Sequence, residues 1–307
     1  ADGKADIYVS VAGKVPSQQR RNLLFINQGT DAEGIPTFVE KAAAFGLDDD
    51  GYSTQAAFLD YDRDGDNDLY LLTNALEKFH RNNLRPKRTE GEAPSTDRLY
   101  RNNGDGTFTN VSAEAGILIE GYGLGVAVSD LNFDGWPDVY VANDFLSNDL
   151  VWVNQGDGTF SNRAAEYLKH QTHNGMGTDI ADINNDQMPD IAVLDMLPEG
   201  NYREKIMLPK GSHTLFLQKQ EMDYQDQYMR NTLQLHRGLL PNGAPRFSEI
   251  GQLAGLAATD WSWSVLFADY DNDGWKDAYI TNGYRKDVTN LDYISYSSSY
   301  DVFGTAE

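Results

Sequence analysis

The chain has 307 residues, 40% of them hydrophobic, and a formal net charge of −22 at pH 7. This length supports one large all-β domain or two average domains with a substantial core. The negative charge argues against nucleic acid and anionic membrane surfaces as partners, because both would repel it. The sequence has no cysteine and no apolar run long enough to cross a membrane, so neither disulfides nor direct membrane insertion are expected.

The N-terminal stretch ADGKADIYVS has no signal-peptide pattern, and we expect a leader to lie outside this chain. Asp2, Gly3 and Asp6 match the second half of an Asp-rich loop that recurs later in the sequence. This first loop lacks its opening positions and is predicted to be incomplete. Residues 22–47 follow it as a loose copy of a strand–turn–strand unit.

The stretch DYDRDGDND, residues 60–68, places five aspartates in nine residues. The pattern returns three times, each time after a short apolar run and before a strand of alternating apolar residues. The four copies with their strands are DYDRDGDNDLYLLTN (60–74), DLNFDGWPDVYVAND (130–144), DINNDQMPDIAVLDM (182–196) and DYDNDGWKDAYITNG (269–283). Recurrence of this kind indicates a repeated structural unit.

A second shared piece follows the loops. Residues 97–117, DRLYRNNGDGTFTNVSAEAGI, match residues 148–168, and residues 231–256 are a looser copy. The NxGDGTF part predicts a tight turn between two strands. One repeat is therefore strand, Asp-rich loop, strand, connection, strand, turn and strand, and four-stranded sheets repeated every ~50 residues are typical of β-propeller blades.

The predicted fold class is all-β, a β-propeller of four-stranded antiparallel blades with Ca²⁺-binding loops. About five blades are visible, at approximately 1–47, 52–117, 122–168, 175–256 and 260–307, with the first and last partial. Either these blades close a ring, or the chain 1–307 is part of a longer propeller of roughly seven or eight blades. The partial blades at both ends favour the longer propeller.

The nine-residue loops offer side-chain oxygens at positions 1, 3, 5 and 9 and a backbone carbonyl at position 7. Such an all-oxygen cage suits Ca²⁺ better than Mg²⁺, and the absence of His and Cys argues against zinc. The predicted ligands are Asp60, Asp62, Asp64, Asp66 and Asp68; Asp130, Asn132, Asp134, Trp136 and Asp138; Asp182, Asn184, Asp186, Met188 and Asp190; and Asp269, Asp271, Asp273, Trp275 and Asp277. Without a cation the converging carboxylates would repel one another.

Two other interpretations of the loops are weaker. An EF-hand needs a Glu at position 12, but Leu71, Val141, Val193 and Ile280 stand there, each within a predicted strand. Four solvated acidic turns without a metal would not need the same spacing four times. Of the four sites, 182–190 is expected to bind most weakly, because Gln187 replaces the glycine of the turn.

On these loops, strands and GDGTF turns, nearly the whole chain resembles the FG-GAP/VCBS repeat family of integrin-α-type β-propellers. Within it, YMRNTLQLHRG and ATDWSWSVLFADYDNDGWKDAYITNGY are most similar to large bacterial surface or secreted proteins related to the cartilage acidic protein group. The resemblance implies Ca²⁺ in the loops on one propeller face, an extracellular location and a role in adhesion or binding. The motif that names the family is poorly kept, so integrin-like ligand binding is not implied.

Two long connections are predicted on the face opposite the loops. Residues 75–97 hold a basic cluster, and residues 197–230 are rich in Tyr, Met, Gln and Arg, a composition of adaptable contact surfaces. The candidate partner-binding residues are Lys78, Arg81, Arg85, Lys87, Arg88, Tyr202, Arg203, Tyr224, Tyr228 and Trp261. The alternative is that both connections only pack against the fold. Trp261 and Trp263 in DWSWS are a candidate sugar-stacking platform, but their alternation into a strand favours a core position for at least one of them.

Two functional hypotheses follow. The first is a non-catalytic, calcium-stabilised scaffold at the cell surface, associated with a bacterial outer membrane and binding other proteins of a surface complex. The second is a glycan-binding module or carbohydrate-active enzyme of the polysaccharide-lyase type, which would need a base beside a bridging Ca²⁺. His213, Tyr202, Arg203 and Tyr224 are the residues available for that role, and their spacing does not require it.

Overall fold

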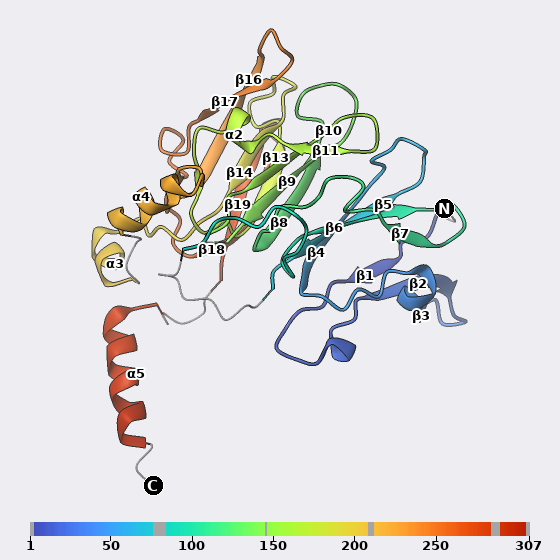
Figure 1. Cartoon of the computed structure of the whole chain (residues 1–307), viewed down its shortest axis with the longest axis horizontal. Helices are drawn as coiled ribbons and strands as arrows, with labels where there is room; N and C mark the ends of the chain where they lie inside the picture. The colour runs from blue at the N-terminus through green and yellow to red at the C-terminus, as the bar shows by residue number, and fades with distance from the viewer. Residues whose placement is uncertain (1–2, 76–83, 145, 208–211, 284–288, 305–307) are drawn as a thin grey trace. The chain divides into compact units, whose positions relative to one another are not determined.

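The computed structural model describes residues 3–75, 84–144, 146–207, 212–283 and 289–304. Contacts divide the chain into two compact units, Ala1–Tyr167 and Leu168–Glu307. Each unit is built mainly from antiparallel sheets whose strands follow one another in chain order (Figure 1).

The described residues of the first unit form one three-stranded and two four-stranded sheets. The three-stranded sheet is formed by β1 (Ile7–Val9), β2 (Leu23–Thr30) and β3 (Pro36–Glu40), with a 3₁₀ turn at Ser17–Gln19 and α1 (Ala42–Phe45) after β3. The next sheet is β4 (Ser53–Leu59), β5 (Asp68–Thr73), β6 (Arg98–Asn102) and β7 (Phe108–Asn110). The last is β8 (Gly123–Ser129), β9 (Asp138–Asn143), β10 (Leu150–Asn154) and β11 (Phe160–Asn162), followed by α2 (Ala164–Tyr167).

In the second unit, the part of the chain that the structure describes forms one four-stranded sheet and two two-stranded sheets. The four-stranded sheet is β13 (Thr178–Ala181), β14 (Asp190–Val193), β16 (Thr232–Leu239) and β17 (Pro245–Glu249). β18 (Ser262–Ala268) pairs with β19 (Asp277–Asn282), and β12 (Gln171–Thr172) pairs in parallel with β15 (Gln227–Tyr228). The helices are α3 (Asn201–Ile206), α4 (His213–Glu221) and α5 (Leu291–Gly304).

The four-stranded antiparallel sheets confirm the predicted fold class. In each of them an Asp-rich loop joins the first strand to the second, and every neighbouring pair of strands is antiparallel. The first strands of three sheets share an irregularity near their start, between Ser53 and Gln55 in β4 and at the matching residues of β8 and β18. The sheets are therefore copies of one structural unit, with the topology of propeller blades.

The second strand of each four-stranded sheet lies in the core. All residues of β5, β9 and β14 are buried, because apolar side chains on both faces pack against neighbouring elements. In the first unit, Tyr70 and Leu72 of β5 share a hydrophobic cluster with Val126, Val139 and Trp152 of the following sheet. The loops are thus attached to fully buried strands.

The connection 197–230, for which no secondary structure was predicted, is partly helical. It contains α3 and α4, and Ser212 caps α4 by accepting a hydrogen bond from the N–H of Leu215 (3.3 Å). β15 then anchors its C-terminal end beside β12. The described parts of this connection therefore form a helical insertion between β14 and β16 of the four-stranded sheet of the second unit.

Candidate metal centres

The four Asp-rich loops share one hydrogen-bonded frame. In the first loop, the N–H of Gly65 donates to Asp60 Oδ2 (3.1 Å) and the N–H of Asp66 donates to Asp64 Oδ1 (2.9 Å). The other loops repeat both bonds: Gly135 to Asp130 (2.8 Å) and Trp136 to Asp134 (2.8 Å); Gln187 to Asp182 (2.8 Å) and Met188 to Asp186 (2.9 Å); Gly274 to Asp269 (2.9 Å) and Trp275 to Asp273 (2.8 Å). Backbone donors therefore orient the carboxylates at positions 1 and 5 in every loop.

Two residues of each loop adopt left-handed backbone conformations. Position 6 has φ values of 95°, 87°, 69° and 91° at Gly65, Gly135, Gln187 and Gly274. Position 4 has φ values of 60°, 59°, 59° and 60° at Arg63, Phe133, Asn185 and Asn272. Glycine adopts this conformation without strain, so Gln187 carries a conformational cost of about 1 kcal/mol that its three counterparts avoid.

The aspartate at position 9 connects the loop to the third strand of the sheet. Asp68 is fully buried; its Oδ2 accepts from the N–H of Tyr61 (3.1 Å) and its Oδ1 from the N–H of Asn102 (2.7 Å). The same pairs of bonds reach Asp138 from Leu131 (3.0 Å) and Asn154 (2.9 Å), and Asp190 from Ile183 (3.1 Å) and His236 (2.8 Å). Position 9 thus has a structural role that the sequence analysis, which treated it only as a ligand, did not predict.

Burial affects the acidity of these aspartates. It raises the pKa of Asp68 to about 6 and that of Asp138 to about 7, despite the backbone donors that lower both. The pKa of Asp190 is raised for the same reason. Neighbouring loop carboxylates add to each rise, so a cation that neutralised them would favour the ionised forms.

The first loop has the clearest features of a cation site. One ligand oxygen each from Asp60, Asp62 and Asp68 lies within 4.8 Å of the others. Asp60 Oδ1 and Asp62 Oδ1 are buried and have no hydrogen-bond partner, and burial with the nearby Asp64 raises the pKa of Asp62. Buried carboxylate oxygens without a partner are costly unless a cation compensates them. The donor set is all oxygen and fits a hard divalent cation such as Ca²⁺.

The other three loops differ in their ligand chemistry. Asp269, Asp271 and Asp273 form a second group of carboxylates within 4.8 Å, more exposed than the first. The two loops with Asn at position 3 do not form such a group: Asn132 Nδ2 donates to Asp134 Oδ2 (2.8 Å), and Asn184 Nδ2 donates to Asp186 Oδ2 (3.0 Å). In these loops a neutral amide replaces one carboxylate and donates a hydrogen bond to another, so the repulsion within the cluster is smaller.

The position-7 residues contribute more than a backbone group. Besides the N–H bonds given above, the ring of Trp136 lies under the Arg63 guanidinium, with 5.1 Å between Arg63 Cζ and the ring centroid. Trp275 has an exposed side chain. Their backbone carbonyls, like those of Asp66 and Met188, are the atoms predicted to complete each cage.

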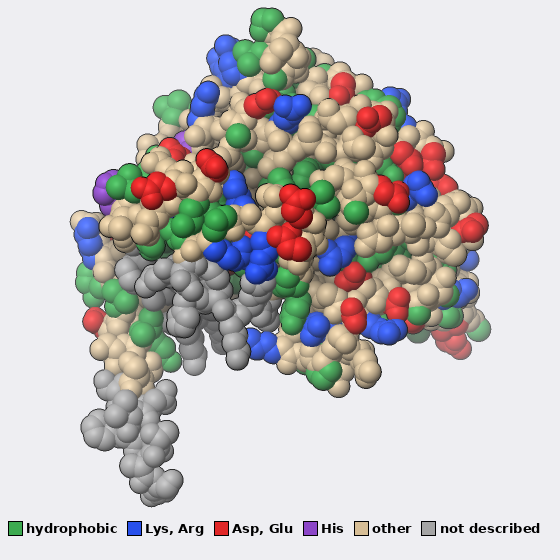
Figure 2. All heavy atoms as spheres, viewed as in Figure 1, with side chains coloured by type: hydrophobic (Ala, Val, Ile, Leu, Met, Phe, Trp, Pro, Cys, Tyr) green, Lys and Arg blue, Asp and Glu red, His purple; other side chains and the backbone are tan. Residues whose placement is uncertain are grey.

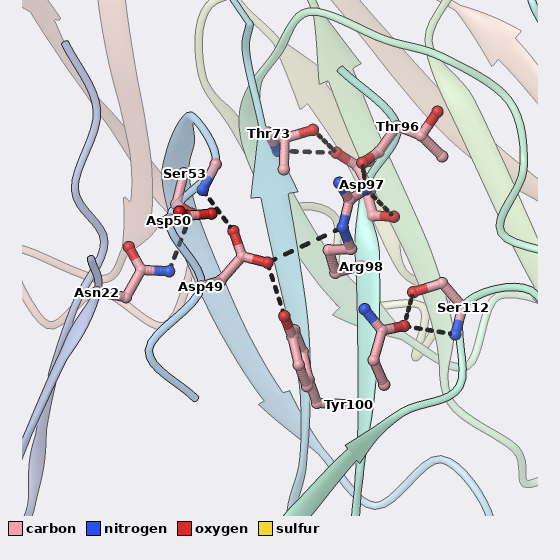
Figure 3. Close-up of polar contacts among 12 residues, drawn as sticks. Asn22, Asp49, Asp50, Ser53, Thr73, Thr96, Asp97, Arg98, Tyr100 and Ser112 are labelled. Atoms are coloured by element: carbon pink, nitrogen blue, oxygen red, sulfur yellow. Dashed lines mark hydrogen bonds and ion pairs between the residues drawn. The ribbon is translucent and has the colours of Figure 1, made fainter. Parts of the chain in front are cut away.

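A second recurrent polar contact was missed by the sequence analysis. Asp97 is fully buried before β6, and its carboxylate accepts from Tyr70 Oη (2.8 Å) and from the N–H of Thr73 (2.8 Å), as Figure 3 shows in part. Asp149 repeats this contact before β10, accepting from Tyr140 Oη (2.8 Å) and the N–H of Asn143 (2.9 Å).

Asparagine takes the same place in two other sheets. Asn22 Nδ2 donates to Tyr8 Oη (2.9 Å), and Asn231 Oδ1 accepts from the N–H of Asp195 (2.7 Å). The sequence signal that could have predicted this contact was an Asp or Asn before each third strand, with a Tyr in most second strands.

Where the residue is an aspartate, its acidity also changes: burial raises the pKa of Asp97 to about 6.

The basic cluster of residues 75–97 is only partly described. Lys78 and Arg81 lie outside the described residues. Arg85 forms a two-pronged ion pair with the buried Glu120, with 2.8 Å between Arg85 Nη2 and Glu120 Oε2. Lys87 Nζ lies 3.5 Å from Asn148 Oδ1, and the N–H of Arg88 donates to Glu120 Oε1 (2.9 Å). On the face shown in Figure 2, several Lys and Arg side chains likewise lie beside Asp or Glu. These contacts attach this connection to the fold.

The helical insertion distributes its candidate residues between surface and interior. Tyr202 is 75% exposed, whereas Tyr224 is buried. Arg203 pairs with Asp260 through Nε–Oδ2 (2.5 Å) and Nη2–Oδ1 (2.9 Å), and Trp261 lies between this aspartate and the first residue of β18.

Tyr228 lies in a row of aromatic rings that the sequence analysis did not anticipate. Its ring centroid is 5.3 Å from that of His170 and 6.0 Å from that of Phe216, and Phe216 stacks on His213 at 6.5 Å. Tyr228 is 42% exposed. Of the four lyase-type candidates, His213 stacks on Phe216, Arg203 pairs with Asp260, Tyr202 is exposed and Tyr224 is buried.

The fold and its loops define a class: all-β proteins of four-stranded antiparallel sheets in which an Asp-rich loop joins the first two strands. Among the described residues, no helix is long and apolar enough to span a membrane. A family model described as FG-GAP-like repeat matches residues 91–141 and again residues 130–193. Residues 91–193, about a third of the chain, are thus similar to FG-GAP-like repeats.

The chain is also similar to cartilage acidic protein 1 of several vertebrates. It is 27% identical to the Mus musculus protein over 183 residues, which cover 59% of this chain and 23% of the relative. The Homo sapiens protein is 27% identical over 183 residues (59% and 22%), and the Xenopus tropicalis protein 28% over 185 residues (60% and 23%). The chain thus spans less than a quarter of the length of these curated relatives.

Proposed function

We propose that the chain is a calcium-stabilised, non-catalytic binding scaffold that acts outside the cell or at its surface. The observation that supports it best is the pair of buried oxygens, Asp60 Oδ1 and Asp62 Oδ1, without hydrogen-bond partners in an all-oxygen loop. A divalent cation would compensate both charges, and Ca²⁺ tolerates the irregular ligand set that the loop offers. Four loops with the same frame give four candidate sites, with 182–190 the weakest.

The scaffold role is supported by the repeat architecture. FG-GAP-like repeats are typical of adhesion and binding scaffolds, and the similarity to cartilage acidic protein 1 is consistent with this class. An extracellular location would supply the calcium that loops of moderate affinity need. Attachment to a bacterial outer membrane, as a subunit of a surface complex, is the form of this role that we propose.

The helical insertion is the surface that we propose for protein partners. Tyr202 and Tyr228 expose large parts of their rings there, and such rings contribute contact area at low conformational cost. Arg203 and Tyr224, in contrast, have contacts within the fold and are better placed to support that surface than to touch a partner. Arg85 is held by Glu120 in the same way.

A pull-down from surface extract of the source organism, in millimolar Ca²⁺ and again in excess chelator, tests this function. We expect a discrete set of proteins retained only in Ca²⁺, and its loss when Tyr202 and Tyr228 are both changed to Ser. Tyr296→Ser is the matched control, because Tyr296 is 62% exposed on α5, outside the insertion. An empty pull-down with the protein still folded would contradict protein binding and direct the next assays to glycans.

A further inference from the structure

Neighbouring Asp-rich loops contact one another through the residue at position 4. In the first unit, the Arg63 guanidinium of loop 60–68 lies over the Trp136 ring of loop 130–138, at 5.1 Å. A Cβ added at Gly135 would lie 3.4 Å from Arg63 Nη1, so the guanidinium also borders position 6 of that loop. The side chain that projects from one loop thus reaches positions 6 and 7 of the next.

The second unit repeats this relation with different chemistry. Asn185, at position 4 of loop 182–190, donates a hydrogen bond from Nδ2 to the carbonyl oxygen of Gly274 (2.8 Å). Gly274 is at position 6 of loop 269–277. The peptide bond that carries this carbonyl also carries the N–H of Trp275, which donates to Asp273 Oδ1 (2.8 Å). Asn185 therefore fixes a peptide unit that orients a candidate ligand of the neighbouring loop.

We propose that Arg63 and Asn185 are positioning residues for the cation site of the following loop, and that cation binding at paired loops is therefore coupled. This inference rests on the proposed calcium function. The position-4 residue stands between two candidate ligands of its own loop, Asp62 and Asp64 or Asn184 and Asp186. A cation that fixes those ligands also fixes the backbone at position 4, and with it the side chain that reaches the next loop.

The expected coupling is positive. When the first loop of a pair is ordered by its cation, the second loop has less conformational freedom to lose on binding its own. Couplings between sites are typically about 5-fold to 150-fold in affinity, and a single hydrogen bond places this one near the lower end. Because each unit has its own pair, 60–68 with 130–138 and 182–190 with 269–277, the coupling is expected within each unit separately.

The pair in the second unit offers a built-in reporter and a matched control. Trp275 belongs to loop 269–277, so its fluorescence reports cation binding at that loop, and Trp275→Phe should abolish the signal. Asn185 and Asn272 occupy the same loop position with φ values of 59° and 60°. Replacing either by Gly removes one amide from the same backbone conformation without strain. Only Asn185 has a hydrogen bond to a neighbouring loop among those found for the described residues.

The test is a Ca²⁺ titration of Trp275 fluorescence in the full chain. Asn185→Gly is expected to weaken the reported affinity roughly 5-fold, whereas Asn272→Gly should change it less than twofold. Unfolding midpoints in chelator should fall only slightly for both variants, because both amides are exposed, and slightly more for Asn185→Gly, which also loses the hydrogen bond to Gly274. Equal titration curves for Asn185→Gly and the wild type, or equal weakening by both variants, would overturn the coupling.

A second comparison separates coupling from local damage. Asp269→Asn, which disables loop 269–277, should by reciprocity weaken Ca²⁺ binding at loop 182–190, measured by calorimetry, in the wild-type background and have no further effect when Asn185 is already Gly. An effect of the same size in both backgrounds would contradict the proposal. A wild-type protein that binds no Ca²⁺ by calorimetry would instead refute the calcium function itself, so the two failures are distinguishable.

Discussion

Loops 60–68 and 182–190 have the same backbone frame and different chemistry inside it. In both, position 1 accepts from the N–H of position 6, and position 9 accepts from the third strand. Loop 60–68 has only carboxylates at positions 1, 3 and 5 and leaves two buried oxygens without partners. Loop 182–190 has Asn184 at position 3, which donates to Asp186 (3.0 Å). The frame is thus held by backbone hydrogen bonds, whereas the need for a cation depends on the side chains within it.

The largest expected effect is that of calcium removal, because it acts on every loop whose charge is unbalanced. Each site held at 100 times its dissociation constant stabilises the folded chain by about 2.7 kcal/mol. Thermal unfolding in excess chelator should therefore begin several degrees below unfolding in millimolar Ca²⁺, at about 2–4 °C per kcal/mol for a domain of this size. Identical midpoints in calorimetry would show that the loops do not depend on a cation.

Asp138→Asn tests the frame rather than the charge. Both oxygens of Asp138 accept backbone N–H groups, from Leu131 and Asn154, so an amide would turn an NH₂ group toward one of these donors. We expect a loss of about 2 kcal/mol in unfolding free energy, with and without Ca²⁺. Denaturant unfolding measures it, and a loss confined to the calcium-loaded protein would argue that position 9 acts only as a ligand.

Exchanging Asp and Asn at position 3 tests the charge rather than the frame. Asp62→Asn should weaken Ca²⁺ binding at its loop at least about tenfold, since ligand charge sets affinity, and should stabilise the protein in chelator. Asn132→Asp, the reverse exchange, should tighten binding and destabilise the protein in chelator. Calorimetry measures the Ca²⁺ affinity, and chemical unfolding measures the stability in chelator. The two exchanges should change each quantity in opposite directions, and changes in the same direction would contradict the comparison.

Gln187→Gly removes the backbone difference between the two loops. Gln187 has φ of 69°, a conformation that costs a non-glycine residue about 1 kcal/mol. The unfolding free energy of the variant, measured in denaturant, should be about 1 kcal/mol larger, and the weakest site should bind Ca²⁺ more tightly. Gly65→Gln should produce the reverse in the first loop. An unchanged stability for both would show that the turn absorbs the side chain without strain.

Asp97→Asn is expected to have the smallest effect at neutral pH and a clear effect on pH dependence. Burial raises the pKa of Asp97 to about 6, above its ordinary value. Its contribution to stability is therefore fully present below about pH 4 and is lost as pH rises through about 6. Replacement by Asn, the residue found in the equivalent place at Asn22, should reduce the fall in stability between pH 4 and pH 7. Unfolding curves in chelator at pH 4 and pH 7 measure this fall in stability for the variant and for the wild type.

Repetition explains why the fold could be predicted from one sequence. Four copies of the Asp-rich loop, each between an apolar run and an alternating strand, indicate antiparallel sheets more firmly than any single motif. The contacts of Arg85 with Glu120 and of Arg203 with Asp260 could not be predicted, because they join residues 35 and 57 positions apart through the folded chain. The helices of the insertion were also missed, since their short sequences lack a regular apolar stripe.

The structural role of position 9 shows a further limit of sequence reasoning. A ligand pattern indicates which residue types converge, but hydrogen bonds such as that from Asn102 to Asp68 depend on the register between distant strands. The recurrent Asx residue before each third strand was visible in the repeats. Its role depends on the hydrogen bond between Asp97 and Tyr70, which are 27 positions apart in the sequence and meet only in the folded chain.

The most direct test of the central claim is the number of Ca²⁺ ions bound per chain, measured by equilibrium dialysis and elemental analysis at millimolar Ca²⁺. The four loops predict four bound ions in the wild type. Asp182→Asn, which disables loop 182–190, should remove the ion that binds most weakly. Asp60→Asn combined with Asp62→Asn should remove one ion and leave the other three. A folded wild-type chain that binds none at this concentration would contradict the account.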